Sequence, residues 1–315
     1  MLYTDRLNLT GPLLEGFTFP EGTALFVIGD VHGQAQALRD LLDGLGRIST
    51  PGHKRVLVFL GDLIDRGPDS YGSLEAAWCE AASRGRMDEV HFLPGNHELL
   101  LAGAMDEAAR GAEALGNKSQ AACWAMNGGH AFMSEVSERF DLKPQACPVG
   151  TMTQFADSLR RIMPEGFLEA VRSWPSHYRV GDVLCVHAGI APKKPLCDTL
   201  NLSQQSHWPT TLRDRERSDR HWAWIREKFL AWQGGWPTSG KKDAETGLLV
   251  VHGHSVAPGA SLRKLTDGPS LEKVLCRAAT NGRICLDAGS SRNVGVAAMV
   301  MTAEAHRLAF APCVA

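Results

Sequence analysis

The chain of 315 residues has no apolar run that approaches 18 residues, so no membrane-spanning helix is predicted. Neither sign of charge dominates, because 33 Lys and Arg are balanced by 35 Asp and Glu, for a formal net charge of -2. A chain this neutral has no general attraction for nucleic acid or acidic membranes, and neither is predicted as a partner. The start, MLYTDRLNLTGPL, lacks the basic and apolar regions of a signal peptide.

Paired cysteines are also absent. None of the eight cysteines belongs to a C-x-x-C motif, and several lie inside apolar runs such as VLCVHAG and RICLDAG. In such runs a free cysteine behaves as a small hydrophobic side chain. We therefore predict a reduced, cytoplasmic protein, and a chain of this length can bury a core without disulfides.

What the sequence does contain is one arrangement repeated along the chain, in which a short apolar run ends in a Gly-rich polar cluster. Runs rich in Val, Ile, Leu and Phe predict buried strands, with the polar clusters on loops at one end of a sheet. Open α/β sheets bind their ligands on such loops. The runs are ALFVIGDVHG from Ala24, RVLVFLGDLIDRG from Arg55, VHFLPGNHE from Val90, VLCVHAG from Val183, GLLVVHGHS from Gly247 and RICLDAGS from Arg283.

Helical patterns separate these runs. SLEAAWCEAASRG predicts a helix with Gly85 as its C-cap, and RHWAWIREKFLAW predicts another over 220–232. VAAMVMT and HRLAFAP predict the last two strands. A further helix follows Gly33 and places five apolar side chains on one face, namely Ala37, Leu38, Leu41, Leu42 and Leu45.

The organisation we predict is a single catalytic domain over 1–315, with a helical insertion at about 105–173. The insertion carries no ligand cluster, so we expect it to face the substrate. An irregular stretch rich in Pro, Ser, Gln and Arg follows at about 192–219. Substrate specificity is expected to lie in these two segments.

The polar residues at the strand ends form a mixed ligand set of carboxylate, amide and imidazole groups. Such a set suits Mn²⁺, Fe or Zn²⁺. It exceeds the needs of one catalytic metal, so two divalent ions that share one carboxylate are predicted, and two-metal sites catalyse phosphate ester hydrolysis. The residues are Asp30, His32, Asp62, Asn96, His187 and either His252 or His254.

Three more side chains fit phosphate chemistry. Arg66 can hold phosphate oxygens by bidentate contact. His97 can protonate a leaving alkoxide, with Asp65 orienting its imidazole. Each motif alone also has an ordinary explanation, because Asp-Gly and Gly-Asn are turn signals and a histidine at a strand end is often structural. The hypothesis depends on the recurrence of these residue types in one context.

With these residues assembled, the sequence resembles the calcineurin-like metallophosphoesterases, and among them the bacterial branch of the PPP-type serine/threonine protein phosphatases. The resemblance implies an α/β fold with a central β-sandwich of two mixed sheets flanked by helices. The signatures G-D-x-H-G, G-D-x-x-D-R-G, G-N-H-E, H-A-G and G-H-[TS] stand in order at 29–33, 61–67, 95–98, 187–189 and 253–255.

The resemblance also implies residue roles. His254 rather than His252 is the implied ligand, because the family's histidine precedes Thr or Ser. Arg226 in WIREKF is the candidate for a second phosphate-binding arginine beside Arg66 and Asn96, although a solvated helix face would also explain it. The implied ligands are Asp30, His32 and Asp62 for the first metal, and Asp62, Asn96, His187 and His254 for the second.

One further segment, MNGGHAFMS from Met126, resembles an N-G-G segment of the bacterial branch. Asn127 and its two glycines could also simply form a turn.

The predicted function is hydrolysis of phosphate monoesters by direct attack of a metal-bridging hydroxide, with phosphoserine and phosphothreonine proteins or small phosphate esters as substrates and Mn²⁺ as the first choice of metal. The alternative is a diadenosine tetraphosphate hydrolase. Those enzymes typically lack the second Asp of G-D-x-x-D-R-G and carry G-N-H-D, whereas this chain has Asp65 and Glu98. A non-catalytic phosphoprotein-binding scaffold is a third reading, although no ligand of the set is missing. Metal identity, physiological substrate and oligomeric state stay open.

Overall fold

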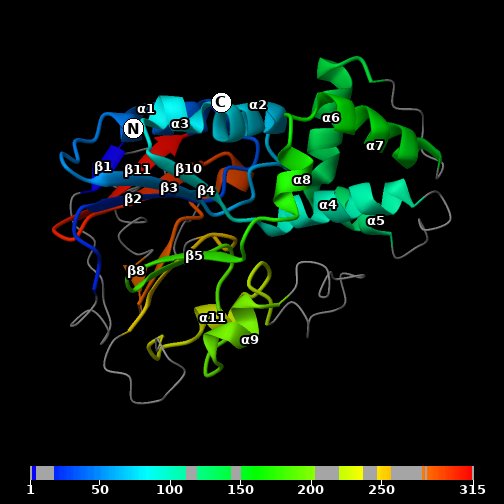
Figure 1. The fold of residues 1–315 in the computed structure, drawn as a ribbon. Coiled ribbons are helices and arrows are strands. Elements are labelled where there is room, and N and C mark those ends of the chain that lie inside the picture. Colours follow the sequence, from blue (N-terminus) through cyan, green and yellow to red (C-terminus); the bar gives the residue numbers. More distant parts are fainter. Residues whose placement is uncertain are drawn as a thin grey trace.

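A computed structural model describes residues 2–4, 18–110, 119–142, 150–202, 220–236, 247–256, 279–280 and 282–313. Two β-sheets pack face to face, with helices on both outer sides (Figure 1). The predicted α/β fold with a sandwich of two mixed sheets is confirmed. The strands are β1 (Leu2–Thr4), β2 (Thr23–Ile28), β3 (Lys54–Phe59), β4 (Glu89–Phe92), β5 (His177–Val180), β6 (Val183–Val186), β7 (Leu249–His252), β8 (Ala279–Thr280), β9 (Arg283–Cys285), β10 (Gly295–Met301) and β11 (His306–Pro312).

The helices lie outside the two sheets and in the segment that follows β4. The first sheet has the order β1-β11-β10-β2-β3-β4, with α1 to α3 over its outer face, and the second has the order β5-β6-β7-β9-β8 (Figure 1). The helices are α1 (Ala35–Gly46), α2 (Ser70–Leu74), α3 (Ala81–Gly85), α4 (Asn96–Ala109), α5 (Gln120–Trp124), α6 (His130–Arg139), α7 (Gly150–Ile162), α8 (Phe167–Val171), α9 (Leu196–Leu200) and α11 (Glu227–Leu230), with π-helical turns at Glu75–Glu80 and Ala125–Gly129 and a 3-10 turn at Ser290–Arg292.

Strand β2 shows how the layers are held together. Successive side chains of a strand point to opposite faces. Phe26 and Ile28 therefore join the core under the helices, whereas Leu25 and Val27 join the core between the sheets. The five apolar side chains predicted for one face of α1 are all buried against this first core.

Parallel strands bring the polar loops together. β2, β3 and β4 are parallel neighbours in the first sheet, and β6, β7 and β9 are parallel neighbours in the second. The carboxyl ends of parallel neighbours lie at the same edge. A hydrogen bond of 2.8 Å from His187 Nδ1 to the carbonyl of Leu60 joins these edges of the two sheets.

The helix predicted over 220–232 is wrong for most of its length. Only Glu227–Leu230 is helical. The carbonyl of Trp222 accepts from the backbone N–H groups of Ala188 and Gly189, at 2.8 and 3.3 Å, and is therefore not available for a helix. The C-cap prediction is also off by one residue, because α3 includes Gly85 and the left-handed residue is Arg86 at φ 49°.

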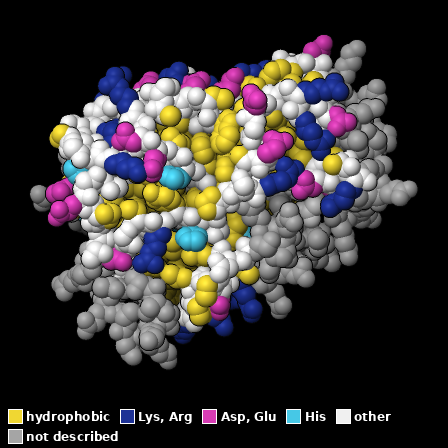
Figure 2. All heavy atoms as spheres, in the orientation of Figure 1, with side chains coloured by type: hydrophobic (Ala, Val, Ile, Leu, Met, Phe, Trp, Pro, Cys, Tyr) yellow, Lys and Arg dark blue, Asp and Glu magenta, His cyan; other side chains and the backbone are white. Residues whose placement is uncertain are grey.

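The described surface carries both signs of charge. In Figure 2, basic and acidic side chains alternate over this face and a band of hydrophobic side chains crosses its middle. No helix of the described residues is long and apolar enough to span a membrane. The division into one domain with an insertion at 105–173 stays a prediction, and most of the irregular stretch at 192–219 lies outside the described residues.

Candidate active site

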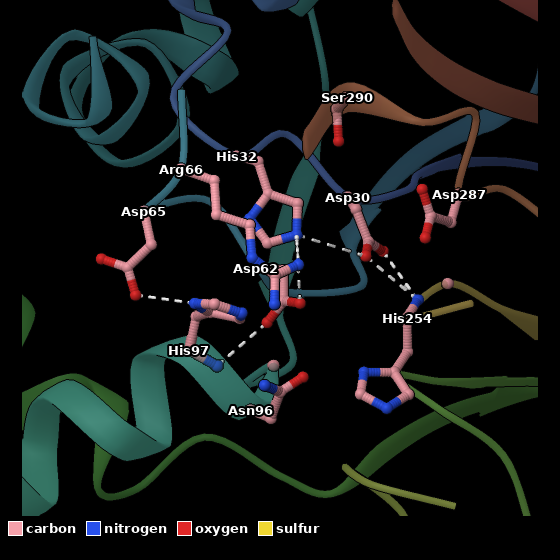
Figure 3. Close-up of polar contacts among 12 residues, drawn as sticks. Asp30, His32, Asp62, Asp65, Arg66, Asn96, His97, His254, Asp287 and Ser290 are labelled. Carbon is pink, nitrogen blue, oxygen red and sulfur yellow. Dashed lines mark hydrogen bonds and ion pairs between the residues drawn. The ribbon is translucent and has the colours of Figure 1, made fainter. Parts of the chain in front are cut away.

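The candidate site lies where the two sheets meet, at the ends of their parallel strands (Figure 3). The loops after β2, β3 and β4 bring Asp30, Asp62 and Asn96, and the loops after β6 and β7 bring His187 and His254. All five side chains are buried, with exposed fractions of 0 to 5%. The polar residues that follow different runs in the sequence are thus brought together.

Asp62 occupies the centre. Its Oδ2 lies 3.5 Å from His32 Nε2 and 3.4 Å from His187 Nε2, so one carboxylate oxygen stands between histidines of the two sheets. Its Oδ1 accepts from the backbone N–H of His97 at 3.0 Å. A carboxylate between two donor clusters can bridge two metal ions.

Both flanking histidines are fixed by backbone carbonyls. His32 Nδ1 lies 3.0 Å from the Ile64 carbonyl, and His187 Nδ1 lies 2.8 Å from that of Leu60. A carbonyl can only accept a hydrogen bond, so the Nδ1 of each ring carries a proton. In a neutral ring, Nε2 then has no proton and its lone pair faces Asp62. Metal-binding histidines are held in this way.

A second group of donor atoms surrounds His187 Nε2. This nitrogen lies 3.2 Å from Asn96 Oδ1 and 3.3 Å from His254 Nδ1, in addition to its contact with Asp62. The backbone N–H of His254 donates to Asp30, with distances of 3.0 and 3.1 Å to the two oxygens. A proton on His187 Nε2 or a metal ion between these atoms would remove the repulsion between their lone pairs.

The buried carboxylates of the site also favour binding of a cation. Burial, then the charges of Asp287 and Asp62, raise the pKa of Asp30 well above its usual value. Burial alone would lower the pKa of His187, but Asp62 and then Asp30 raise it to about 9. His254 Nε2 is buried and has no hydrogen-bond partner among the described residues. Divalent ions that bind this donor set would neutralise the carboxylates and coordinate that nitrogen.

Two buried triads meet the distance requirements for holding a metal, and they share Asp62. One is Asp62, His187 and His254, and the other is His32, Asp62 and His97. The second therefore contains His97 where the predicted ligand set has Asp30. Asp30 Oδ2 also faces this cluster, 3.9 Å from His32 Nε2. The two triads are consistent with a dinuclear metal site.

His97 is held by a carboxylate, whereas His32 and His187 are held by backbone carbonyls. Its Nδ1 lies 2.7 Å from Asp65 Oδ2, and neither side chain is exposed. Its Nε2 is buried without a partner among the described residues. Burial lowers the pKa of His97 to about 3, and Arg66 acts in the same direction.

The two arginines contact different histidines of the cluster. Arg66 Nη1 is 3.2 Å from His32 Nε2. Arg226 Nη1 donates to the carbonyl of His254 at 2.8 Å and to Ser255 Oγ at 3.0 Å. His252 lies outside both triads, with its ring edge-on to Phe229 at 4.8 Å.

The backbone of the site is strained. His32, Asp62, Asp65, Arg66 and His254 all have positive φ, between 45 and 71°. Each non-glycine residue in this region costs roughly 1 kcal/mol or more, and such strain concentrates at functional sites. The surrounding contacts must compensate for it.

Sequence reasoning assigned no role to Glu98 and Asp287. Glu98 is buried and its carboxylate accepts three backbone N–H groups of the G-D and G-N motifs. Asp287 follows β9 and lies beside Asp30 in Figure 3. Its position after RICL is the same signal that identified the other strand-end residues. Trp124 was also missed, and it donates from Nε1 to Asp65.

Comparison with known proteins extends this picture. A family model described as calcineurin-like phosphoesterase matches residues 24–278. The asymmetrical bis(5'-nucleosyl)-tetraphosphatase PrpE of Bacillus mycoides (strain KBAB4) is 38% identical over 76 residues, 22% of this chain and 30% of that protein. A protein of Caenorhabditis elegans assigned as a serine/threonine-protein phosphatase is 44% identical over 72 residues, 23% of this chain and 18% of that one.

These matches span less than a third of each relative's length. Among solved structures, a cold-active protein-tyrosine phosphatase of a psychrophilic Shewanella is 16% identical with a TM-score of 0.43, over 94% of this chain and 84% of that one.

Proposed function

The chain belongs to the calcineurin-like phosphoesterase family, and on that premise we propose that it hydrolyses phosphate monoesters of serine and threonine in proteins. The observation that supports this proposal is the pair of His97 and Asp65, which join at 2.7 Å and are fully buried. A serine or threonine alkoxide is a poor leaving group and gains much from protonation, whereas a nucleotide leaving group gains less.

In this proposal each group of residues has one task. When bound, two divalent ions would lower the pKa of a bound water toward neutral pH and offset the charge of the phosphate. Arg66, Arg226 and Asn96 hold the phosphate oxygens. The proposed ligands are Asp30, His32 and Asp62 for one ion, and Asp62, Asn96, His187 and His254 for the other.

His97 Nε2 gives its proton to the leaving oxygen, while the Nδ1–H group of His97 stays hydrogen-bonded to Asp65. Burial lowers the pKa of His97 in the free site. A phosphate dianion held by Arg66 acts in the opposite direction and favours the charged imidazole that this role requires.

The similarity to PrpE supports a second candidate, hydrolysis of dinucleoside tetraphosphates on the same residues. The two are separated by kcat/KM of one Mn²⁺-loaded sample on a phosphoserine/phosphothreonine peptide and on diadenosine tetraphosphate. We expect the peptide to be preferred, and a clear preference for the dinucleotide would replace the proposal. The Asp62→Asn variant should lose both activities, so its rates measure the background of each assay. No turnover of either substrate would favour a binding scaffold.

A further inference from the structure

We propose that the segment from Trp124 to Gly129 is a positioning clamp that holds Asp65 and Arg66 in their working orientations. This inference rests on the proposed phosphomonoesterase function. The segment lies at the end of α5 and in the π-helical turn after it, about 60 residues away in sequence from the two side chains it contacts. It contains the N-G-G that a simple turn would also explain.

The first contact fixes Asp65, the carboxylate that orients His97. The Trp124 indole is fully buried, and its Nε1 lies 2.9 Å from Asp65 Oδ2 and 3.1 Å from Oδ1. A buried carboxylate must be hydrogen-bonded, and the donors set its plane. Since Asp65 Oδ2 also receives His97 Nδ1, the plane of the carboxylate sets the direction in which His97 Nε2 points.

The second contact fixes the arginine. Arg66 Nε donates to the Asn127 carbonyl at 3.2 Å, and the Arg66 backbone N–H donates to the Gly128 carbonyl at 3.3 Å. Arg66 is exposed and has a φ of 69°, so neither burial nor an ordinary backbone conformation holds it. These two carbonyls tie its backbone and its side chain to the same turn. Asn127 is anchored in turn by Nδ2, which donates to the Cys123 carbonyl at 2.8 Å.

The two glycines are required by these contacts. A Cβ on Gly128 would lie 2.6 Å from Arg66 Cγ, and Gly128 has a φ of +116°. A Cβ on Gly129 would lie 2.6 Å from the Trp124 indole. Gly128 therefore makes room for Arg66, and Gly129 makes room for the indole that contacts Asp65. A turn with no role at the site would not need both.

The test separates positioning from packing through leaving-group dependence. Trp124→Phe keeps most of the ring and removes the N–H, so we expect kcat to fall about tenfold on an alkyl phosphate and little on dinitrophenyl phosphate. Gly128→Ala should raise KM and the inhibition constant for inorganic phosphate about tenfold on all substrates, because it displaces Arg66. Bound Mn²⁺ per chain should stay at the wild-type value in both.

Trp78→Phe is the matched control. Trp78 lies in the neighbouring helical layer, and its indole N–H donates to the Glu165 carbonyl at 3.0 Å, away from the site. Its leaving-group dependence should equal that of the wild type. If Trp124→Phe retains the wild-type dependence while the wild type hydrolyses both esters, the clamp is wrong and the function stands. If Gly128→Ala leaves the inhibition constant for inorganic phosphate unchanged, the claim that this turn positions Arg66 is wrong. A wild type without monoesterase activity overturns the function instead.

Discussion

Shortening Glu98 by one methylene should weaken both the fold and the metal centre. Glu98 Oε2 accepts from the backbone N–H groups of Asp62 and Gly95 at 2.8 and 2.9 Å, and Oε1 accepts from that of Leu63 at 2.7 Å. Asp62 has a left-handed φ of 53°. The buried carboxylate of Glu98 thus holds Asp62, the proposed bridging residue, in a strained conformation.

The magnitude follows from the geometry. Glu98→Asp withdraws the carboxylate by about 1.5 Å, one C–C bond, which carries all three contacts beyond hydrogen-bond distance unless α4 moves. Hydrogen bonds to a charged group contribute roughly 1.5–3 kcal/mol each. With partial relaxation, we expect the free energy of unfolding of the metal-free protein to fall by about 2–4 kcal/mol. We expect Mn²⁺ affinity to fall by about 10- to 100-fold, as for other residues that orient metal ligands.

Urea unfolding of the metal-free protein and calorimetric titration with Mn²⁺ measure these two effects. Glu107→Asp is the matched control on the same helix. Glu107 is buried and accepts from Ser119 Oγ at 2.8 Å and from the Ala121 N–H at 3.0 Å, far from the ligands in sequence. It should lose stability but keep its Mn²⁺ affinity. Wild-type stability and affinity in Glu98→Asp would refute the reasoning.

Three more predictions follow from the geometry. His97→Asn should lower kcat by about 10²-fold or more on alkyl phosphates and much less on dinitrophenyl phosphate, and equal losses on both would remove its role as an acid. Chelation should abolish hydrolysis and lower the melting temperature, and Mn²⁺ at 100 times its Kd should restore about 2.7 kcal/mol of stability. Burial raises the pKa of Glu135 from 4.5 to about 7, so the folded state binds this proton more tightly and stability falls as the pH rises between these values. Glu135→Gln has one acceptor for the two N–H groups of Ser70 and Tyr71 and should be less stable overall. In urea titrations its stability should nevertheless fall less than that of the wild type between pH 4 and pH 8, by about 1 kcal/mol, a value reduced for the partial exposure of Glu135.

Most of the strands and the ligand cluster could be predicted from sequence because both depend on local signals. An apolar run such as the one in β3 is buried on both faces whatever its neighbours, and the loops after parallel strands share an edge. β5 was not predicted, since His177–Val180 is a half-buried edge strand with polar residues. Its extended conformation depends on pairing with β6, which is a tertiary property.

The residues that support the site were harder to identify. Trp124 has the burial of an ordinary core residue, and nothing local indicates that its N–H reaches a carboxylate 59 positions earlier. The helix expected at 220–232 failed for a related reason, because the Trp222 carbonyl is used by the H-A-G loop. Periodicity predicts which face of a segment is apolar, but not which backbone groups another segment will use.

The hydrogen bond between His254 and Asp30 joins residues 224 positions apart. A ribosome adds about 5–20 residues per second, so roughly 10–45 s separate the synthesis of these two residues. During that interval the nascent chain lacks His254, and strands β10 and β11 of the first sheet are still to be made. The complete set of donors exists only once the second sheet has been made and has docked. Metal binding by the full set of donors is therefore expected late in the biosynthesis of this protein.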